Sequence, residues 1–497
     1  MANKPVSRRE FLKATALGGG GIVLAACAAP AVPEVAAPAA TAAPAATAAP
    51  AATAAPAATA APAATAAPEV GAAPSPTPEK TVITYWVEHT DSATNANMET
   101  YIIKPFYKAY PDVQIELIAM PDYDRKLDAA VAADSVPDMY NQGGPAWVTP
   151  YALAGYTLDL SPYIDEKGWR DKLWPWMWDS VNFQDKYICV PTEFEMLNTY
   201  YNRQMFEENG WSMPTNYDEI VALGKEMQAK QIIPYGYGAS GATLVHQWWW
   251  SYAFHAYAGA HTVWEALTGA RPWTDDVFVE AIQKLTDLWN AGFITDKKAL
   301  GISVGDGRGL WVNGKAAMLQ EGTWTLRAID QWAGSLPWDV VQSPMWRDDV
   351  LKQPAIGCGE TLQINAKTKH VDACINYVDF VFFGEKTSIL KWADKPGIPA
   401  TYLPPRDYEA SDFPRTFNPV YKDAILPMVE AAKNRDFGFI AWSNWPKATN
   451  TYLWSNLEAV LLGQSTPANY MAGAQAAYEK ELAQGLVITN LPEPRSV

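Results

Sequence analysis

Cysteine and histidine are scarce in this chain of 497 residues, which holds four cysteines and five histidines. No CxxC motif and no Cys/His cluster occurs, so the ligand spacing of a zinc site is missing. No Ser-His-Asp constellation is recognisable either. These absences argue against a zinc site, and we expect no cofactor, whereas calcium binding stays open.

Basic residues are outnumbered, with 38 Lys and Arg against 54 Asp and Glu, which gives a formal net charge of −16. Residues 1–26 carry four Lys/Arg and one Glu, so the chain without them has a net charge near −19. An acidic surface disfavours nucleic acid and anionic lipid as partners. The chain also has no arginine cluster of the kind that binds phosphate or another anion.

Long hydrophobic runs are also lacking. No segment reaches the roughly 18 uninterrupted apolar residues of a membrane-spanning helix. The apolar stretch 14–26 is too short, and it follows a basic start with Arg8 and Arg9. This arrangement is typical of an export signal, and the arginine pair makes it resemble a twin-arginine signal. The alternative is a chance pair of arginines in an ordinary secretory signal.

Leu24-Ala25-Ala26-Cys27 resembles a bacterial lipobox, in which the cysteine becomes the lipidated first residue of the mature chain. We therefore expect a protein outside the cytoplasm, attached to the membrane only through lipid at Cys27.

Residues 27–80 are of low complexity. Proline recurs every six residues from Pro38 to Pro68, and alanine and threonine fill the intervals. Regular prolines interrupt helix formation, so we expect a semi-extended linker. All 22 tryptophans lie at or after Trp86, which marks the start of the globular part.

Residues 81–497 show alternating strand and helix patterns. Strands are predicted at 82–87, 113–117 and 138–140, separated by helices at 97–110 and 123–133. Further helices are predicted to begin after Asn216, with Glu219 in a capping box, and at 277–290, 371–383 and 468–484. This order predicts an α/β fold with parallel strands and helices on both faces. Among Cys189, Cys358 and Cys374, one disulfide with one free thiol and three buried thiols both remain open.

Four segments, at 190–219, 311–324, 357–383 and 461–467, are spread over nearly all of residues 81–497. They include the Tyr-Asn pair at 201–202 and the Gly-x-Trp ending at Trp324. In order and spacing they resemble the extracellular solute-binding proteins of ABC sugar importers, the class that includes maltose-binding protein. The resemblance implies a periplasmic-binding-protein-like fold of two lobes, joined by a hinge of crossing segments.

The resemblance also implies where the chain crosses between the lobes: near Pro191, between about 344 and 354, and near Trp392. Lobe one is then 81–191 plus 354–388, and lobe two is 192–353 plus 389–497. The implied partners are a small sugar ligand and the permease subunits of a transporter, and the implied state is a monomer.

Ligands of open α/β sheets bind beyond the carboxyl ends of the strands. Glu88 and His89 follow the first predicted strand, and Asn141 and Gln142 follow the third. We predict that Glu88 and Gln142 bond to sugar hydroxyls, while ordinary loop polarity is the alternative. His89 is the weaker candidate of the four.

Acidic residues near the predicted hinge are further candidates. Glu193 and Glu195 flank Phe194 in an extended stretch, so both carboxylates point to one face. The resemblance places Glu195 at a ligand-contacting position. Glu360 follows Gly357-Cys358-Gly359, where glycine permits a close approach of backbone to ligand.

Tryptophan supplies the apolar part of the predicted site, because an indole face covers the C–H face of a pyranose. The resemblance places Trp324 on the cleft. Trp248, Trp249, Trp442 and Trp445 are further candidates, although Trp248, Trp249 and Trp250 cannot all face one way.

The leading hypothesis is therefore a receptor that captures a neutral sugar or short oligosaccharide by hinge closure. A receptor of the same fold for a non-sugar solute is a second possibility. An extracytoplasmic carbohydrate-active enzyme is a third, but Glu193 and Glu195 lie side by side, whereas glycosidase carboxyls face each other across the scissile bond.

Overall fold

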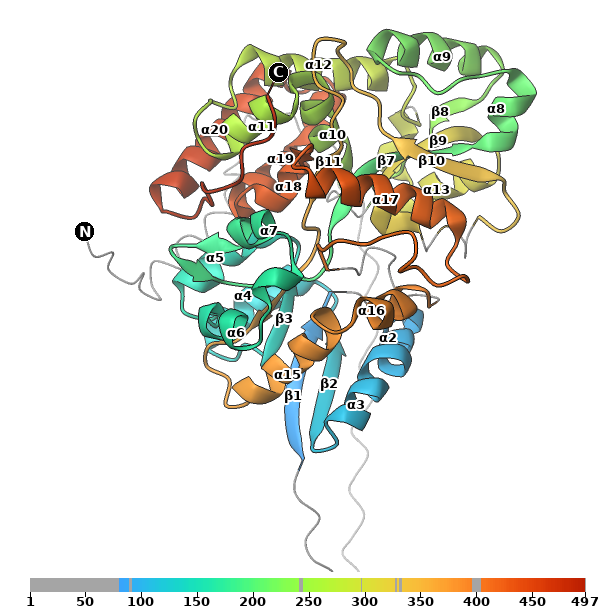
Figure 1. Ribbon diagram of the computed structural model, residues 1–497. Coiled ribbons are helices and arrows are strands. Elements are labelled where there is room, and N and C mark those ends of the chain that lie inside the picture. The colour runs from blue at the N-terminus through green and yellow to red at the C-terminus, as the bar shows by residue number, and fades with distance from the viewer. Residues whose placement is uncertain are drawn as a thin grey trace, which may run out of the picture. The chain divides into compact units, whose positions relative to one another are not determined.

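Two mixed β-sheets form the framework of the chain in its computed structural model (Figure 1). The structure describes residues 80–88, 92–240, 245–295, 297–326, 329, 333–395 and 404–496. The predicted export signal, Cys27, nearly all of the predicted linker and His89 lie outside these residues. From Lys80 onward the described residues belong to one compact unit.

The first sheet has the strand order β2-β1-β3-β12-β6. Its strands are β1 (Thr81–Val87), β2 (Val113–Ala119), β3 (Met139–Gln142), β6 (Val190–Pro191) and β12 (Thr361–Ile364). β1 runs parallel to both β2 and β3, as the sequence predicts, whereas β12 is antiparallel to its neighbours β3 and β6. Burial alternates along β1, so only one of its faces is fully covered.

Helices connect and cover the strands of this sheet. The helix predicted at 97–110 is a composite of α2 (Ser92–Met98), a π-helical turn (Glu99–Ile103) and α3 (Lys104–Ala109), and it ends before Pro111. The prediction at 123–133 matches α4 (Tyr123–Ala133), and the one at 371–383 matches α15 (Val371–Phe382). The remaining helices here are α5 (Pro145–Leu153), α6 (Ser161–Glu166), α7 (Pro175–Ser180) and α16 (Lys386–Ala393).

The second sheet has the order β13-β11-β7-β9-β8, and β10 pairs with β7 off this path. Its strands are β7 (Glu195–Asn202), β8 (Ile233–Tyr235), β9 (Ala316–Gly322), β10 (Trp338–Gln342), β11 (Ala355–Gly357) and β13 (Gly438–Phe439). β7 is central and antiparallel to β9 and β11. The longest strand of this sheet is thereby buried along almost its whole length.

The helices that accompany the second sheet include most of the long helices of the chain. They are α8 (Arg203–Asn209), α9 (Tyr217–Ala229), α10 (His246–Ala258), α11 (Ala260–Leu267), α12 (Asp276–Asn290), α13 (Val304–Val312), α17 (Pro419–Lys433), α18 (Ala441–Asn444), α19 (Lys447–Leu461) and α20 (Pro467–Ala483). Asn216 caps α9 as predicted, accepting from the backbone N–H of Glu219 at 3.0 Å. The predicted capping box differs in its second half, because the Glu219 carboxylate accepts from Thr215 instead of the cap residue.

Two short segments carry the chain between the sheets. The first, residues 192–194, joins β6 to β7, close to the crossing predicted at Pro191. The second, residues 358–360, joins β11 to β12. This second crossing is predicted between about 344 and 354, but β11 still pairs with β7 and β13, so the chain crosses later. The other lobe boundaries stay predictions.

The two crossing segments are hydrogen-bonded to each other. The backbone N–H and the hydroxyl of Thr192 both donate to the carbonyl oxygen of Glu360, at 3.2 and 3.0 Å. This contact fixes the register of one crossing against the other.

The three cysteines of the globular part, Cys189, Cys358 and Cys374, are buried and free. Burial raises the pKa of each thiol, so all three are kept in the unreactive protonated form. Within the described residues, none of the helices combines the length and the apolar character needed to cross a membrane.

Candidate functional site

The sheet topology brings the predicted site residues to one place. In the second sheet, the ends of β9 and β11 meet the start of β7, because Gly322 pairs with Leu197 and Gly357 pairs with Glu195. In the first sheet, the ends of β3 and β6 meet the start of β12 at Thr361. The crossing segments 192–194 and 358–360 join these two edges directly. Residues distant in sequence therefore gather around the crossings.

Four of the predicted carboxylates interact with one another. Glu195 starts β7, Glu193 and Glu360 lie in the two crossing segments, and Glu88 follows β1. Glu193, Glu195 and Glu360 are buried, whereas Glu88 is exposed. A hydrogen bond joins the side chains of Glu195 and Glu193, and such a bond between two carboxyls requires a proton on one of them.

Burial is the main reason that the pKa of Glu195 is raised to about 8. The negative charges of Glu360 and Glu88 raise it further, while the hydrogen bond from Glu193 acts in the opposite direction. The site thus holds a carboxyl that is protonated at neutral pH and able to donate as well as accept.

Gly359 leaves room for the Glu195 carboxylate. A Cβ atom on Gly359 would lie 1.8 Å from Oε2 of Glu195 and 1.9 Å from its Cδ. From the sequence, the glycines around Cys358 are expected to allow a close approach of backbone to ligand. In the structure the close approach at Gly359 is to a side chain of the candidate site itself.

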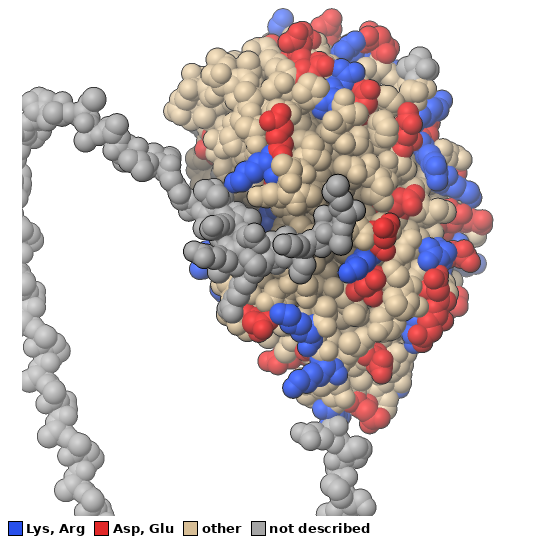
Figure 2. Space-filling view, turned by 90° about the vertical axis from the view of Figure 1, so that its left-hand side faces the viewer, with Lys and Arg blue, Asp and Glu red and all other residues tan. Residues whose placement is uncertain are grey.

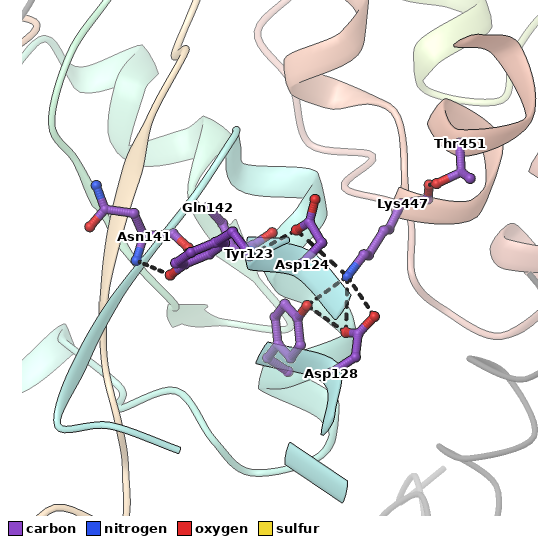
Figure 3. Close-up of polar contacts among 8 residues, drawn as sticks. Tyr123, Asp124, Asp128, Asn141, Gln142, Lys447 and Thr451 are labelled. Carbon is purple, nitrogen blue, oxygen red and sulfur yellow. Dashed lines mark hydrogen bonds and ion pairs between the residues drawn. The ribbon is translucent and has the colours of Figure 1, made fainter. Parts of the chain in front are cut away.

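Two amide side chains lie beside the carboxylates at the end of β3. Asn141 donates through Nδ2 to Glu360 Oε2 at 3.0 Å, and Gln142 donates through Nε2 to Asp124 Oδ1 at 3.4 Å. Tyr123 anchors this end of the strand through hydrogen bonds of 2.9 Å to the Asn141 backbone (Figure 3). The side-chain oxygens of Asn141 and Gln142 are buried and accept from no residue that the structure describes. Both oxygens therefore retain an unused capacity to accept a hydrogen bond among the described residues.

Three tryptophans form an aromatic cluster next to this polar group. The ring of Trp324 lies 5.6 Å from that of Trp248 and 5.8 Å from that of Trp442. Trp324 follows directly on Thr323, whose hydroxyl accepts from the backbone N–H of Met196, the neighbour of Glu195. The 3-10 turn Thr323–Thr325, which carries Trp324, is thus bonded to the start of β7, which carries Glu195.

The Trp324 indole packs over the backbone of Gly322, where a Cβ would lie 1.9 Å from its ring. Trp324 and Trp248 are half-buried, whereas Trp442 is buried and accepts at its carbonyl from Trp147 Nε1 at 3.1 Å. Two of the three rings thus keep some exposed surface.

The other two predicted tryptophans lie in the core instead. Trp249 is buried on α10 and packs edge-on against Tyr235 and Tyr237. Trp445 is fully buried between Trp250 and Trp273. Because α10 turns by about 100° per residue, only Trp248 of the three consecutive tryptophans faces Trp324.

Three further residues near the site are not predicted from the sequence. Arg308 on α13 forms a bidentate ion pair with Glu321, with both N–O distances at 2.7 Å, and lies 5.7 Å from the Trp248 ring. Ser443 on α18 is buried against Gly357, and its hydroxyl has no partner among the described residues. Lys447 on α19 reaches the helices of the first sheet. No local motif marks them, since each is recruited by tertiary packing.

The charges on the face shown in Figure 2 are interspersed, with Lys and Arg next to Asp and Glu and uncharged surface between them. On the part of that face that the structure describes, no broad basic patch is visible.

Solved structures share this fold. A chitin oligosaccharide binding protein superposes with a TM-score of 0.71 at 22% identity, covering 81% of this chain and 99% of that one. A solute-binding protein, RafE, solved in complex with raffinose, gives a TM-score of 0.62 at 21% identity, again covering 81% and 99%. At these identities the likeness establishes the two-sheet periplasmic-binding-protein fold.

A curated relative is more similar in sequence. The chain is 26% identical over 303 residues to a multiple sugar-binding protein of Streptococcus mutans, which is 56% of this chain and 66% of that protein. The matched part falls just short of two thirds of the relative's length. The family model of bacterial extracellular solute-binding proteins matches residues 88–383, more than half of the chain. These residues contain both crossing segments, the four carboxylates and Trp324. The chain therefore belongs to the family of bacterial extracellular solute-binding proteins, which are receptors and not enzymes.

Proposed function

We propose that the chain captures a neutral sugar or short oligosaccharide at the crossing segments and delivers it to the permease of an ABC transporter. The single observation that carries the proposal is that the turn bearing Trp324 is hydrogen-bonded to the start of β7, which bears Glu195. An indole face covers the apolar C–H face of a pyranose, and carboxyl and amide oxygens accept from its hydroxyls. A neutral sugar offers both surfaces at once.

The acceptor-rich character of the site supports a ligand with many donors. The side-chain oxygens of Asn141 and Gln142 lack partners among the described residues, and the buried carboxyls of Glu195 and Glu360 lie beside them. The similar proteins described as binding multiple sugars, chitin oligosaccharides and raffinose support a saccharide in particular.

The proposed location follows from the start of the chain. A twin-arginine signal at 1–26, a lipid at Cys27 and the Pro/Ala/Thr linker at 27–80 would hold the receptor outside the cytoplasm, near its permease. Mass spectrometry of the mature protein tests this, with a diacylglyceryl group on Cys27 as the expected result. A mature chain that starts elsewhere without lipid would contradict it.

Calorimetric titration with a panel of raffinose, diacetylchitobiose, xylotriose, amino acids and polyamines tests the ligand class. We expect binding of a saccharide only. In Trp324→Ala the affinity for that saccharide should fall at least about tenfold, or about 1.4 kcal/mol, because the stacking surface is lost. Trp211→Ala is the matched control, since Trp211 is also half-buried but packs against Phe206 away from the aromatic cluster.

Binding of polyamines or amino acids alone would keep the receptor and overturn the sugar. A saccharide affinity that is equal in both tryptophan variants would overturn the role of Trp324.

A further inference from the structure

Lys447 is the centre of a polar network between the helices of the two sheets (Figure 3). Its Nζ atom lies 2.9 and 3.1 Å from the two carboxylate oxygens of Asp128, and it donates to the hydroxyl of Tyr151 at 2.7 Å. Asp124 Oδ1 is 3.9 Å away. The Tyr151 hydroxyl in turn donates to Asp128 at 2.8 Å.

The partners of Lys447 belong to the first sheet. Helices α4 and α5 share an apolar cluster with β3, which contains Leu127, Val131, Tyr140 and Tyr151. Lys447 opens α19, which packs against α10, α12 and α20 of the second sheet. The ion pair thus ties a helix of one sheet to a helix of the other, 319 residues apart in sequence.

The network reaches the candidate site through Asp124. Its carboxylate accepts from Gln142 Nε2, and the Oε1 atom of the same amide has no partner among the described residues. The bond to Asp124 directs Nε2 toward α4 and leaves Oε1 of the same amide as the unused acceptor.

The positive charge of Lys447 offsets the repulsion between Asp124 and Asp128. Asp124 and Asp128 lie one turn apart on α4, where like charges repel each other. The Lys447 side chain is 19% exposed and that of Asp128 is 29% exposed, so water and salt screen the pair less than at an open surface. Without the ammonium group, the repulsion from Asp128 would be uncompensated, and Asp124 would be driven toward solvent and away from Gln142.

We propose that Lys447 is a positioning residue for ligand capture: it holds α4 against α19 and, through Asp124, orients the Gln142 amide for the ligand. This inference rests on the proposed function, because it assumes that Gln142 contacts the captured solute.

The chain contains a matched control at the C-terminal end of α4, where Asp134 caps the helix. Lys367 Nζ lies 2.6 Å from Asp134, and Tyr156 donates to the same carboxylate at 2.9 Å, which repeats the Lys-Asp-Tyr arrangement. Lys367 follows β12, so this second group stays within the first sheet. A variant of Lys367 therefore loses a similar but more exposed ion pair without loosening α4 from α19.

The test uses the full chain with Cys27→Ser and spin labels at Arg125→Cys on α4 and Ser455→Cys on α19, both exposed positions. The distance between the labels is measured without any saccharide. We expect a longer and broader distance distribution in Lys447→Met and an unchanged one in Lys367→Met.

The second readout is affinity for whichever panel saccharide binds. We expect Lys447→Met to weaken it about tenfold, mainly through faster dissociation, and Lys367→Met to leave it within about twofold. Asp128→Asn should behave like Lys447→Met, and the double variant should be no weaker than either single variant, because both remove the same interaction.

Label distances and affinities that are equal in Lys447→Met and Lys367→Met would overturn the role of Lys447. Because the distance needs no saccharide, this failure is distinct from a panel that does not bind, which would overturn the proposed function.

Discussion

Gly359 and Glu195 show how the absence of a single carbon atom shapes the candidate site. The Glu195 carboxylate occupies the space in which any Cβ at position 359 would lie. The same holds for Gly322 beneath the Trp324 ring. Each glycine therefore lies directly against a candidate ligand-binding side chain. The sequence alone does not show this contact, because it depends on how the tertiary structure places the glycine and the side chain.

Gly359→Ala is expected to reduce ligand affinity far more than stability. The new methyl group collides with the far end of a side chain, so Glu195 moves while the backbone is kept. We expect an affinity loss of about tenfold, or about 1.4 kcal/mol, in calorimetric titration with the panel saccharide that binds.

Gly301→Ala is the control for this substitution, because a Cβ at position 301 would meet nothing within 4 Å. An unchanged affinity in Gly359→Ala, or an equal loss in both variants, would contradict the requirement for glycine.

At the scale of elements, sequence periodicity predicts the long amphipathic helices well and the short strands less well. The prediction at 123–133 coincides with α4, and Ile220, Leu223 and Met227 form the buried stripe of α9. The π-helical turn at Glu99–Ile103 and the three-residue strand β11 carry no local pattern that distinguishes them. Their conformations are decided by the elements packed around them.

Asn216→Ala is expected to lower the free energy of unfolding by about 1 kcal/mol. The Asn216 side chain accepts from the Glu219 N–H, one of the backbone donors that the first turn of α9 leaves unpaired. Urea denaturation measures the change. Asn216→Asp keeps an acceptor and should retain most of the stability, so equal losses in both variants would speak against capping as the cause.

At the scale of the whole molecule, the buried carboxyl group of Glu195 links global stability to pH. Its pKa is about 8 in the folded protein and near 4.5 when unfolded, mainly because the folded chain buries it. The folded state therefore binds the proton more tightly. Its stabilising contribution is complete below about pH 4.5 and is lost as the pH rises through 8.

We expect Glu195→Gln to remove this contribution, so the variant should lose less stability than the parent between pH 5 and 8.5. Urea denaturation at several pH values in this range measures the difference. Parallel pH profiles for the two proteins would show that Glu195 does not titrate in this window.

The sequence by itself determines the class of this protein. Its alternating strand and helix periods, its acidic composition and its four family-like segments lead to an α/β solute-binding receptor, and the family match bears this out. The sequence also selects four acidic residues that the structure brings together: Glu88, Glu193, Glu195 and Glu360. They can be selected because each lies next to a strand end or a predicted crossing, and such positions share one edge of the sheets.

Tertiary structure decides which of the predicted residues lie at that edge, and which further residues join them there. Trp249 and Trp445 are tryptophans like Trp324, but the rotation of α10 and the packing around Trp273 bury them in the core. Lys447 lies more than 300 residues from Asp128, and no local pattern records a contact between two helices of different sheets. Periodicity reports which face of an element is apolar, whereas the partner of that face depends on how the whole chain packs.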